Sequence, residues 1–227
     1  MRKMRASELF DFPENLPFAE FFVADAKPWD WLPNIQAALA AYDWSAVTQP
    51  DNIPAGVHID GPAYVHPSVK FPAYASITGP VWIGAQTEIR PGAYIRGHVI
   101  VGEGCVLGNA CEYKNCLLLN GVETPHYNYV GDSILGNQAH LGAGAILANL
   151  RLDRGDIRVK TPTGVHPTGL RKLGAILGDY AEALCNCVLQ PGTLLGKHSA
   201  VMPGVTYGGF LAANALAYDQ QRVQSRG

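Results

Sequence analysis

Apolar residues in the middle of the chain recur at every sixth position. Counting in sixes from residue 59 to residue 119 gives eleven positions, and all of them are apolar. These are Ile59, Val65, Phe71, Ile77, Ile83, Ile89, Ile95, Val101, Leu107, Tyr113 and Leu119. A step of six residues turns an α-helix by about 600° and would carry the stripe around it, so the period excludes an amphipathic helix. It predicts a prism-shaped β-solenoid in which each hexad forms one flat side and its turn, and three hexads close one coil.

The same frame returns later in the chain, at Leu135, Leu141 and Leu147 and again from Leu177 to Val201. Glycine follows many of these positions, where the backbone has to turn tightly. The large aliphatic residue of each hexad is expected to point inward, and residues 18 apart are expected to stack in successive coils. We therefore predict an all-β fold, a parallel β-helix over residues 55–206.

The two ends of the chain lie outside this frame. Residues 1–54 hold five of the seven Phe and three of the four Trp, and PNIQAALAAY places Ile35, Ala38 and Leu39 on one helical stripe. We interpret residues 1–54 as a short N-terminal helical and aromatic cap with its linker. The cap is expected on the open end of the solenoid, where strand edges would otherwise stay unpaired. Residues 207–227 are interpreted as a C-terminal helix.

The frame is interrupted twice, and polar residues gather at the interruptions. Leu119 and Leu135 are 16 residues apart, which is not a multiple of six, so the chain is expected to leave the prism over residues 120–130. This segment leads into PHYNYVGDS, which holds His126 and Tyr129. Residues 150–173 form a second, charged interruption that predicts a protruding hairpin with its turn at TPTG. Such excursions often lie on the binding face of a solenoid, and the alternative for both is an ordinary solvated loop.

Composition narrows the classes of partner. Lys and Arg number 17 and Asp and Glu 19, so the net charge is −2 and no basic surface indicates a nucleic-acid partner. No apolar run reaches the ~20 residues of a membrane-spanning helix, so no membrane partner is expected. Five cysteines are an odd number, and Cys105, Cys111 and Cys116 lie among apolar residues. This favours core thiols in a reducing, cytoplasmic protein over a disulfide framework.

Three stretches of the sequence resemble a known family. They are NACEYKNCLLL (109–119), PHYNYVGDSILGNQAHLGAGAILANLRLD (125–153) and LRKLGAILGD (170–179). Each is similar to the acetyltransferase half of bifunctional sugar-1-phosphate nucleotidylyltransferase/acetyltransferases, the archaeal-type members in particular. The resemblance implies a left-handed β-helix of hexapeptide repeats, a homotrimer, acetyl-CoA as co-substrate, and glucosamine-1-phosphate or galactosamine-1-phosphate as acceptor. No Gly-rich nucleotide-binding start is present, so no nucleotidylyltransferase domain is expected in this chain.

The resemblance also implies roles for individual residues. His126 occupies the position of the general base, and histidine is suited to accept a proton near neutral pH. Asn149 falls where the family contacts both substrate and base. Arg96 lies 18 residues before Lys114, so two stacked cations are expected to clamp one phosphate. The substrate-binding set is Arg96, Lys114, Tyr129, His140 and Arg158. The backbone amides of Gly142 and Ala143 are expected to face the thioester oxygen of acetyl-CoA.

Two other functions stay open at the level of sequence. The family commonly has Asn at the position of His140 and Thr at that of Ala145, and Arg158 lies where archaeal members carry loop lysines. These departures leave a non-catalytic trimeric scaffold or regulatory protein as one alternative. The other is a metal hydratase of the γ-carbonic anhydrase type, which uses the same fold and three zinc-binding histidines. The paired histidine spacing of those enzymes is missing, so no metal site is expected.

Overall fold

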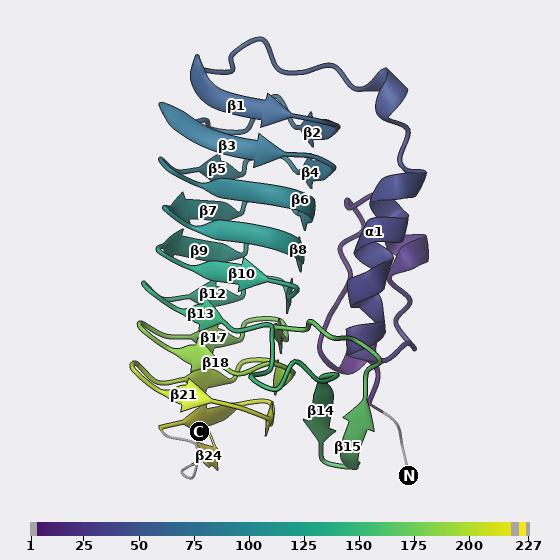
Figure 1. Ribbon diagram of the computed structural model, residues 1–227, viewed down its shortest axis with the longest axis vertical. Helices are drawn as coiled ribbons and strands as arrows, with labels where there is room; N and C mark the ends of the chain where they lie inside the picture. Colours follow the sequence, from purple (N-terminus) through teal and green to yellow (C-terminus); the bar gives the residue numbers. More distant parts are fainter. Residues whose placement is uncertain (1–3, 219–222, 226–227) are drawn as a thin grey trace.

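The computed structural model describes residues 4–218 and 223–225, and most of them wind into a three-sided parallel β-solenoid (Figure 1). The first side is built from β1 (Gly56–Asp60), β3 (Tyr74–Thr78), β6 (Tyr94–Val101), β8 (Glu112–Leu118), β10 (Tyr129–Gly131), β13 (Ile146–Leu147), β18 (Val188–Leu189) and β21 (Thr206–Tyr207). The second side contains β2 (Ala63–Val65), β4 (Val81–Ile83), β11 (Ile134–Leu135), β16 (Ala175–Leu177), β19 (Thr193–Leu195) and β22 (Phe210–Leu211). β6 and β8 are long enough to turn the corner and belong to both of these sides.

The third side is built from β5 (Glu88–Ile89), β7 (Val106–Asn109), β9 (Glu123–His126), β12 (His140–Leu141), β17 (Glu182–Ala183), β20 (Ala200–Val201) and β23 (Ala215–Ala217). The predicted inward residues form one continuous core along the axis, including Ile77, Ile95 and Leu107. All five cysteines are free, and Cys105, Cys111, Cys116 and Cys187 are buried. Burial raises the pKa of the Cys105 thiol to about 12, which keeps this thiol protonated in the core. The all-β solenoid predicted from the six-residue period is confirmed.

The chain does not leave the prism over residues 120–130, so this part of the prediction is wrong. β9 and β10 pair in parallel with the coils above and below them. The coils here are one residue shorter. In the coil of β6 this corner contains two residues in left-handed conformations, Gly97 and His98, whereas in the next coil it contains only one, Asn115. Val99 accordingly pairs with Cys116, 17 residues on. Leu118 therefore points into the core, and Leu119 packs on the outside.

The second excursion is the predicted hairpin. β14 (Arg158–Thr161) and β15 (Gly164–Pro167) pair antiparallel around the TPTG turn. Ile157 and Val159 at the start of the hairpin are buried against the N-terminal segment. The hairpin is therefore anchored beside the prism, as Figure 1 shows, and is not a freely solvated loop.

The N-terminal segment covers the second side of the prism and not its open end, so its predicted position is wrong. It consists of the 3₁₀ turns η1 (Ala6–Glu8), η2 (Ala19–Phe21), η3 (Pro28–Asp30) and η4 (Trp44–Ala46) around α1 (Trp31–Ala41). Its aromatic residues pack on the outward side chains of Trp82, Ile100 and Leu117, which successive coils present on that side. α1 consequently stands beside the stack of coils (Figure 1). In the described part of the chain no helix is long and apolar enough to cross a membrane.

The predicted C-terminal helix is also wrong. Residues 206–217 add a further coil, in which β22 pairs with β19 and β23 with β20, so the solenoid extends beyond residue 206. β24 (Val223–Ser225) then returns antiparallel to β23. The FLAANALA stretch has helix-forming residues, but the exposed edge of the last coil offers it backbone partners and a place for Leu211 in the core. The remainder of the predicted helix lies outside the described residues.

Candidate active site

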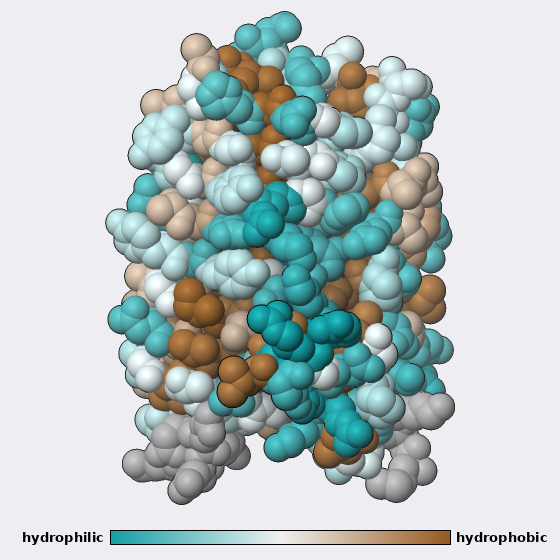
Figure 2. All heavy atoms as spheres, viewed as in Figure 1, coloured by the Kyte–Doolittle hydropathy of each residue, from teal (hydrophilic) through white to brown (hydrophobic). Residues whose placement is uncertain are grey.

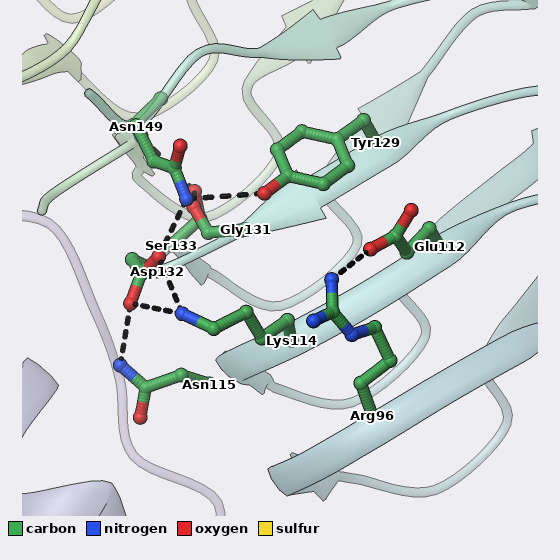
Figure 3. A network of polar contacts seen from close by, with 10 residues as sticks. Arg96, Glu112, Lys114, Asn115, Tyr129, Gly131, Asp132, Ser133 and Asn149 are labelled. Carbon is green, nitrogen blue, oxygen red and sulfur yellow. Dashed lines mark hydrogen bonds and ion pairs between the residues drawn. The ribbon is translucent and has the colours of Figure 1, made fainter. Parts of the chain in front are cut away.

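A buried carboxylate organises the polar residues where β10 ends. Asp132 turns this corner with φ of +48° and is only 4% exposed. Its two oxygens accept hydrogen bonds from Lys114 Nζ at 3.1 and 3.2 Å, from Asn115 Nδ2 at 2.9 Å and from Asn149 Nδ2 at 2.5 Å. Figure 3 shows these donors converging on Asp132 from the coils on either side of it, Lys114 and Asn115 from one and Asn149 from the other. Burying a carboxylate is unfavourable unless donors surround it, and here they do.

The two predicted cations stack as expected. Arg96 in β6 pairs with Lys114 in β8, directly one coil further along the axis. Each has a carboxylate partner: Arg96 Nη1 lies 2.6 Å from Glu112, and Lys114 Nζ lies 3.1 Å from Asp132. The Lys114 side chain is 27% exposed and that of Arg96 44%, so an anion in solution can reach both. The carboxylates hold the two cations side by side on one surface (Figure 3).

Tyr129 and Asn149 belong to the same cluster. Asn149 Nδ2 donates to the Tyr129 hydroxyl at 3.1 Å as well as to Asp132. Burial raises the pKa of Tyr129, so the phenol stays a neutral donor and acceptor. Gly131 lies between them, and a Cβ there would come within 2.5 Å of the tyrosine oxygen and 2.7 Å of the Asn149 amide. The glycine of the VGD motif is thus required by the packing of this cluster.

His126 lies one corner away from this cluster, at the end of β9. Its side chain is exposed, and its backbone is fixed on both sides. The His126 amide donates to Asn128 Oδ1 at 3.3 Å, and its carbonyl accepts from Gly144 at 3.0 Å. The buried Asn128 side chain also donates to the Gly142 carbonyl at 2.8 Å, which ties the corner together. Within the described residues the imidazole makes no hydrogen bond to the Asp132 cluster.

The other predicted residues are placed differently. The Gly142 amide donates to the Ala183 carbonyl at 2.8 Å and is not available to a ligand. The Ala143 amide makes no hydrogen bond within the described residues, so it can be offered to one. His140 Nδ1 lies 3.3 Å from Glu123, on the outer surface of the third side. Arg158 is exposed on the hairpin and takes no part in the cluster around Asp132.

Asp132, Asn115 and His98 also lie at this corner, and the sequence patterns predicted no role for them. His98, Asn115 and Asp132 occupy it in successive coils, and Asn149 follows in the next. Burial and the charge of Lys114 lower the pKa of His98, so this imidazole is neutral at neutral pH. The signal that could have found these residues is a step of 17, which joins 115, 132 and 149. A search in steps of 18 passes over it.

Comparison with known proteins identifies the family. The profile of the GMPPB C-terminal domain matches residues 77–206, more than half of the chain. The chain belongs to the GMPPB C-terminal domain family. The match covers the coils that carry the cluster around Asp132 and the excursion that follows it.

This chain is similar both to bifunctional enzymes and to a shorter protein named only as an acetyltransferase. A bifunctional sugar-1-phosphate nucleotidylyltransferase/acetyltransferase of Sulfurisphaera tokodaii is 30% identical over 189 residues, 83% of this chain and 47% of that protein. The bifunctional protein GlmU of Methanococcus vannielii is 31% identical over 182 residues, 77% of this chain and 41% of that protein. A putative uncharacterized acetyltransferase, YaiX of Escherichia coli, is 31% identical over 165 residues, 65% of this chain and 72% of that protein.

These matches confirm the resemblance to the acetyltransferase half of the bifunctional enzymes. The chain spans less than half the length of the two bifunctional relatives. In the described residues no group of three or more His, Cys, Asp or Glu side chains is arranged to hold a metal ion.

Proposed function

We propose that this protein is a CoA-dependent N-acetyltransferase whose acceptor is an amino sugar carrying phosphate at C1, of the glucosamine-1-phosphate or galactosamine-1-phosphate class. The observation that carries the proposal is the cluster around Asp132. It gathers Lys114, Tyr129 and Asn149, which the family motifs assign to the acceptor, one corner away from His126. The names of the relatives, which include acetyltransferases, support the class of reaction.

Arg96 and Lys114 bind the acceptor's phosphate in this proposal. Two cations one coil apart, about 4.8 Å, can contact different oxygens of one phosphate. Glu112 and Asp132 hold the cations extended before the acceptor arrives, which reduces the entropy lost on binding. Tyr129 and Asn149 then line the space beside the sugar.

His126 acts as the general base. Its exposed imidazole accepts a proton from the acceptor amine while the amine nitrogen forms a bond to the thioester carbonyl carbon. The developing oxyanion accepts a hydrogen bond from the free Ala143 amide, one coil below His126. The tetrahedral intermediate collapses, the C–S bond breaks, and the CoA thiolate takes the proton that His126 holds. The products are the N-acetyl sugar phosphate and CoA.

The active form in this proposal is a homotrimer, with acetyl-CoA in the groove between adjacent prisms. Asp132 positions Lys114 and Asn149 without touching the reacting atoms. His140, on the outer surface of the third side, and Arg158, on the hairpin, are given no contact with the acceptor in this proposal.

Release of free thiol from acetyl-CoA, measured across a panel of amino-sugar 1-phosphates, tests the proposed function. We expect thiol release with at least one amino-sugar 1-phosphate and none with the N-acetylated sugar, which lacks a free amine. Light scattering in the same buffer is expected to give a trimer. A protein that binds acetyl-CoA but acetylates no amino-sugar phosphate would overturn the assignment, and one that does not bind acetyl-CoA would indicate a scaffold.

A further inference from the structure

Two exposed tyrosines form a groove on the first side, next to Arg96, the first of the two proposed phosphate-binding cations. Tyr74 is 56% exposed and Tyr94 is 44% exposed, so the faces of both rings are open to a ligand. They line a shallow cavity of about 290 Å³ together with Gly56, His58, Ser76 and Gly92. This volume lies near the lower limit of small-molecule sites.

Glycines keep the space beside the rings open. Gly56 pairs with Tyr74, and a Cβ built on Gly92 would lie 3.5 Å from Cε2 of the Tyr74 ring. The Tyr74 ring therefore lies over backbone that carries no side chain. Tyr94, in the next coil, pairs with Ser76. The rings thus flank a shallow, aromatic surface with polar Ser76 and His58 at its edge.

The groove is continuous with the cations of the proposed active site. Tyr94 precedes Arg96 by two residues on β6, so both side chains are on the outer face of the same strand. The Arg96 guanidinium carbon lies 5.7 Å from the centre of the Tyr94 ring, and Lys114 follows one coil below Arg96. Figure 2 shows hydrophilic atoms in a band across the middle of this side, and Figure 3 shows Arg96 and Lys114 side by side. Tyr94 and Arg96 thus lie side by side in one coil, and Glu112 and Lys114 lie opposite them in the next coil.

We infer that the Tyr74–Tyr94 groove binds the base of a nucleoside diphosphate, and that the acceptor amino sugar is carried on that nucleotide. This inference rests on the proposed function and extends its acceptor from a sugar phosphate to a nucleotide-linked sugar. A base stacks on tyrosine whatever its identity, and two cations one coil apart can each contact one phosphate of a diphosphate. Glu112 occupies one edge of the Arg96 guanidinium and leaves its other N–H groups for the ligand.

The spacing of the coils agrees with such a ligand. Three strand spacings, about 14 Å, separate the Tyr74 coil from the Tyr129 coil. A base in the groove, a diphosphate on Arg96 and Lys114, and a sugar beside Tyr129 occupy this length in order. A sugar 1-phosphate fills only the lower part and leaves the tyrosines without a ligand.

The adenine nucleotide of CoA also carries a base and phosphates and could occupy the groove. Kinetics distinguish it from a nucleotide-linked acceptor. The test compares an amino-sugar 1-phosphate with the uridine and guanosine diphosphate esters of the same sugar, in the wild-type protein and in Tyr94→Ala. We expect a lower KM for at least one diphosphate ester than for the 1-phosphate. Tyr94→Ala should raise the ester's KM about 5- to 100-fold, the range that base–aromatic stacking supplies, and raise the 1-phosphate's KM by a much smaller factor, because there only the contact between the ring and Arg96 is lost.

Tyr180→Ala is the matched control, because Tyr180 is equally exposed at 48% but lies on another corner, stacked on His198. It should change neither KM. If Tyr94→Ala raises the KM of acetyl-CoA instead, the groove binds the adenine of CoA and the inference is wrong. If only the 1-phosphate is acetylated, the inference is wrong and the proposed function stands.

Calorimetry with uridine or guanosine diphosphate alone tests the groove without turnover. We expect binding to the wild-type protein that is weakened in Tyr94→Ala and retained in Tyr180→Ala. Nucleotide binding without acetylation of any amino sugar would overturn the proposed function but would still support the groove as a nucleotide-binding site. If neither diphosphate binds, the inference that the groove binds a nucleotide is wrong.

Discussion

Replacing Asp179 with Asn should loosen the N-terminal segment from the solenoid. Asp179 Oδ2 accepts a hydrogen bond from the Asp11 amide at 2.9 Å and forms an ion pair with Lys197 Nζ at 3.1 Å, and Oδ1 accepts a hydrogen bond from the Asn137 backbone amide at 2.7 Å. The Asp179 amide donates to the Leu9 carbonyl at 2.9 Å. This one residue therefore joins residues 9–11 to three successive coils of the prism.

The size of the effect follows from which oxygen is lost. In the Asn variant the amide oxygen can still accept from Asn137, but its NH₂ group must face the two donors that Oδ2 accepted. The Asp179 side chain is 2% exposed, so water cannot replace it. The variant loses one hydrogen bond to a charged group, worth ~1.5–3 kcal/mol, together with the ion pair to Lys197, and Lys197 keeps Asp11 as a partner. We expect a loss of about 3 kcal/mol, or roughly 6–12 °C in Tm for a domain of this size.

Asp11→Asn is the matched control, since Asp11 contacts the same lysine at 2.7 Å but its side chain is 84% exposed. An exposed ion pair contributes ~0–1 kcal/mol, so this variant should lose less than 1 kcal/mol. Hydrogen bonding to Lys197 lowers the pKa of Asp11. Its small contribution is thus present above the unfolded pKa of ~3.9 and is lost as the pH falls through the lower folded value.

Urea unfolding followed by tryptophan fluorescence measures both variants, because Trp29, Trp31 and Trp44 all lie in the N-terminal segment. At pH 7 the Asp179→Asn midpoint should fall well below that of Asp11→Asn. As the pH falls through the lowered pKa of Asp11 in the folded protein, the small gap between Asp11→Asn and the parent should close. Equal midpoints for the two variants at pH 7 would refute the assignment of Asp179 as the buried attachment point.

Three further predictions concern binding, packing and thiol chemistry. Lys114→Ala should raise the KM for the sugar phosphate more than it lowers kcat, because the charge contact is present in ground and transition states; steady-state kinetics with an unchanged KM would contradict this. Deleting residues 1–50 should expose Trp82, Ile100 and Leu117 and cause aggregation in light scattering; a soluble, equally stable product would refute the packing. Cys185, the exposed cysteine, should react with a thiol reagent in the native protein well before the four buried ones, as mass spectrometry of peptides can measure.

The six-residue period predicted the core correctly as far as Tyr113, since it reports which side chains point inward. It failed at Leu119, because one residue is missing from the corner at Asn115 and the frame shifts there. Both frames place an apolar residue inside, Leu118 or Leu119, so hydrophobicity alone cannot tell them apart.

The position of the N-terminal segment could not be read from its own composition. Its Phe and Trp residues show that it buries apolar surface, but not which surface. The outward positions of the second side hold Trp82, Ile100 and Leu117 in successive coils, and this second apolar column is the partner. The C-terminal stretch was misassigned for a related reason, since an available strand edge overrides a moderate helix propensity.

The site was partly accessible from sequence. Family motifs identified Lys114, Tyr129 and Asn149, which the structure brings together, and the stacking of Arg96 on Lys114 followed from a full-length coil. Asp132, which links them, lay outside the prediction because its partners are 17 and 18 residues away in coils of unequal length. Only the paired strands show that Asn115 and Asn149 share its corner.

Turnover by His126→Ala tests the central claim most directly. If His126 is the base, this variant should acetylate the amino-sugar phosphate roughly 10²–10⁴ times more slowly than the parent, the usual contribution of general base catalysis. Its affinity for acetyl-CoA, measured by calorimetry, should stay the same, because the imidazole acts on the amine. Near-parental turnover on every amino-sugar phosphate that the parent acetylates would contradict the account and leave His140, beside Glu123, as the residue to examine next.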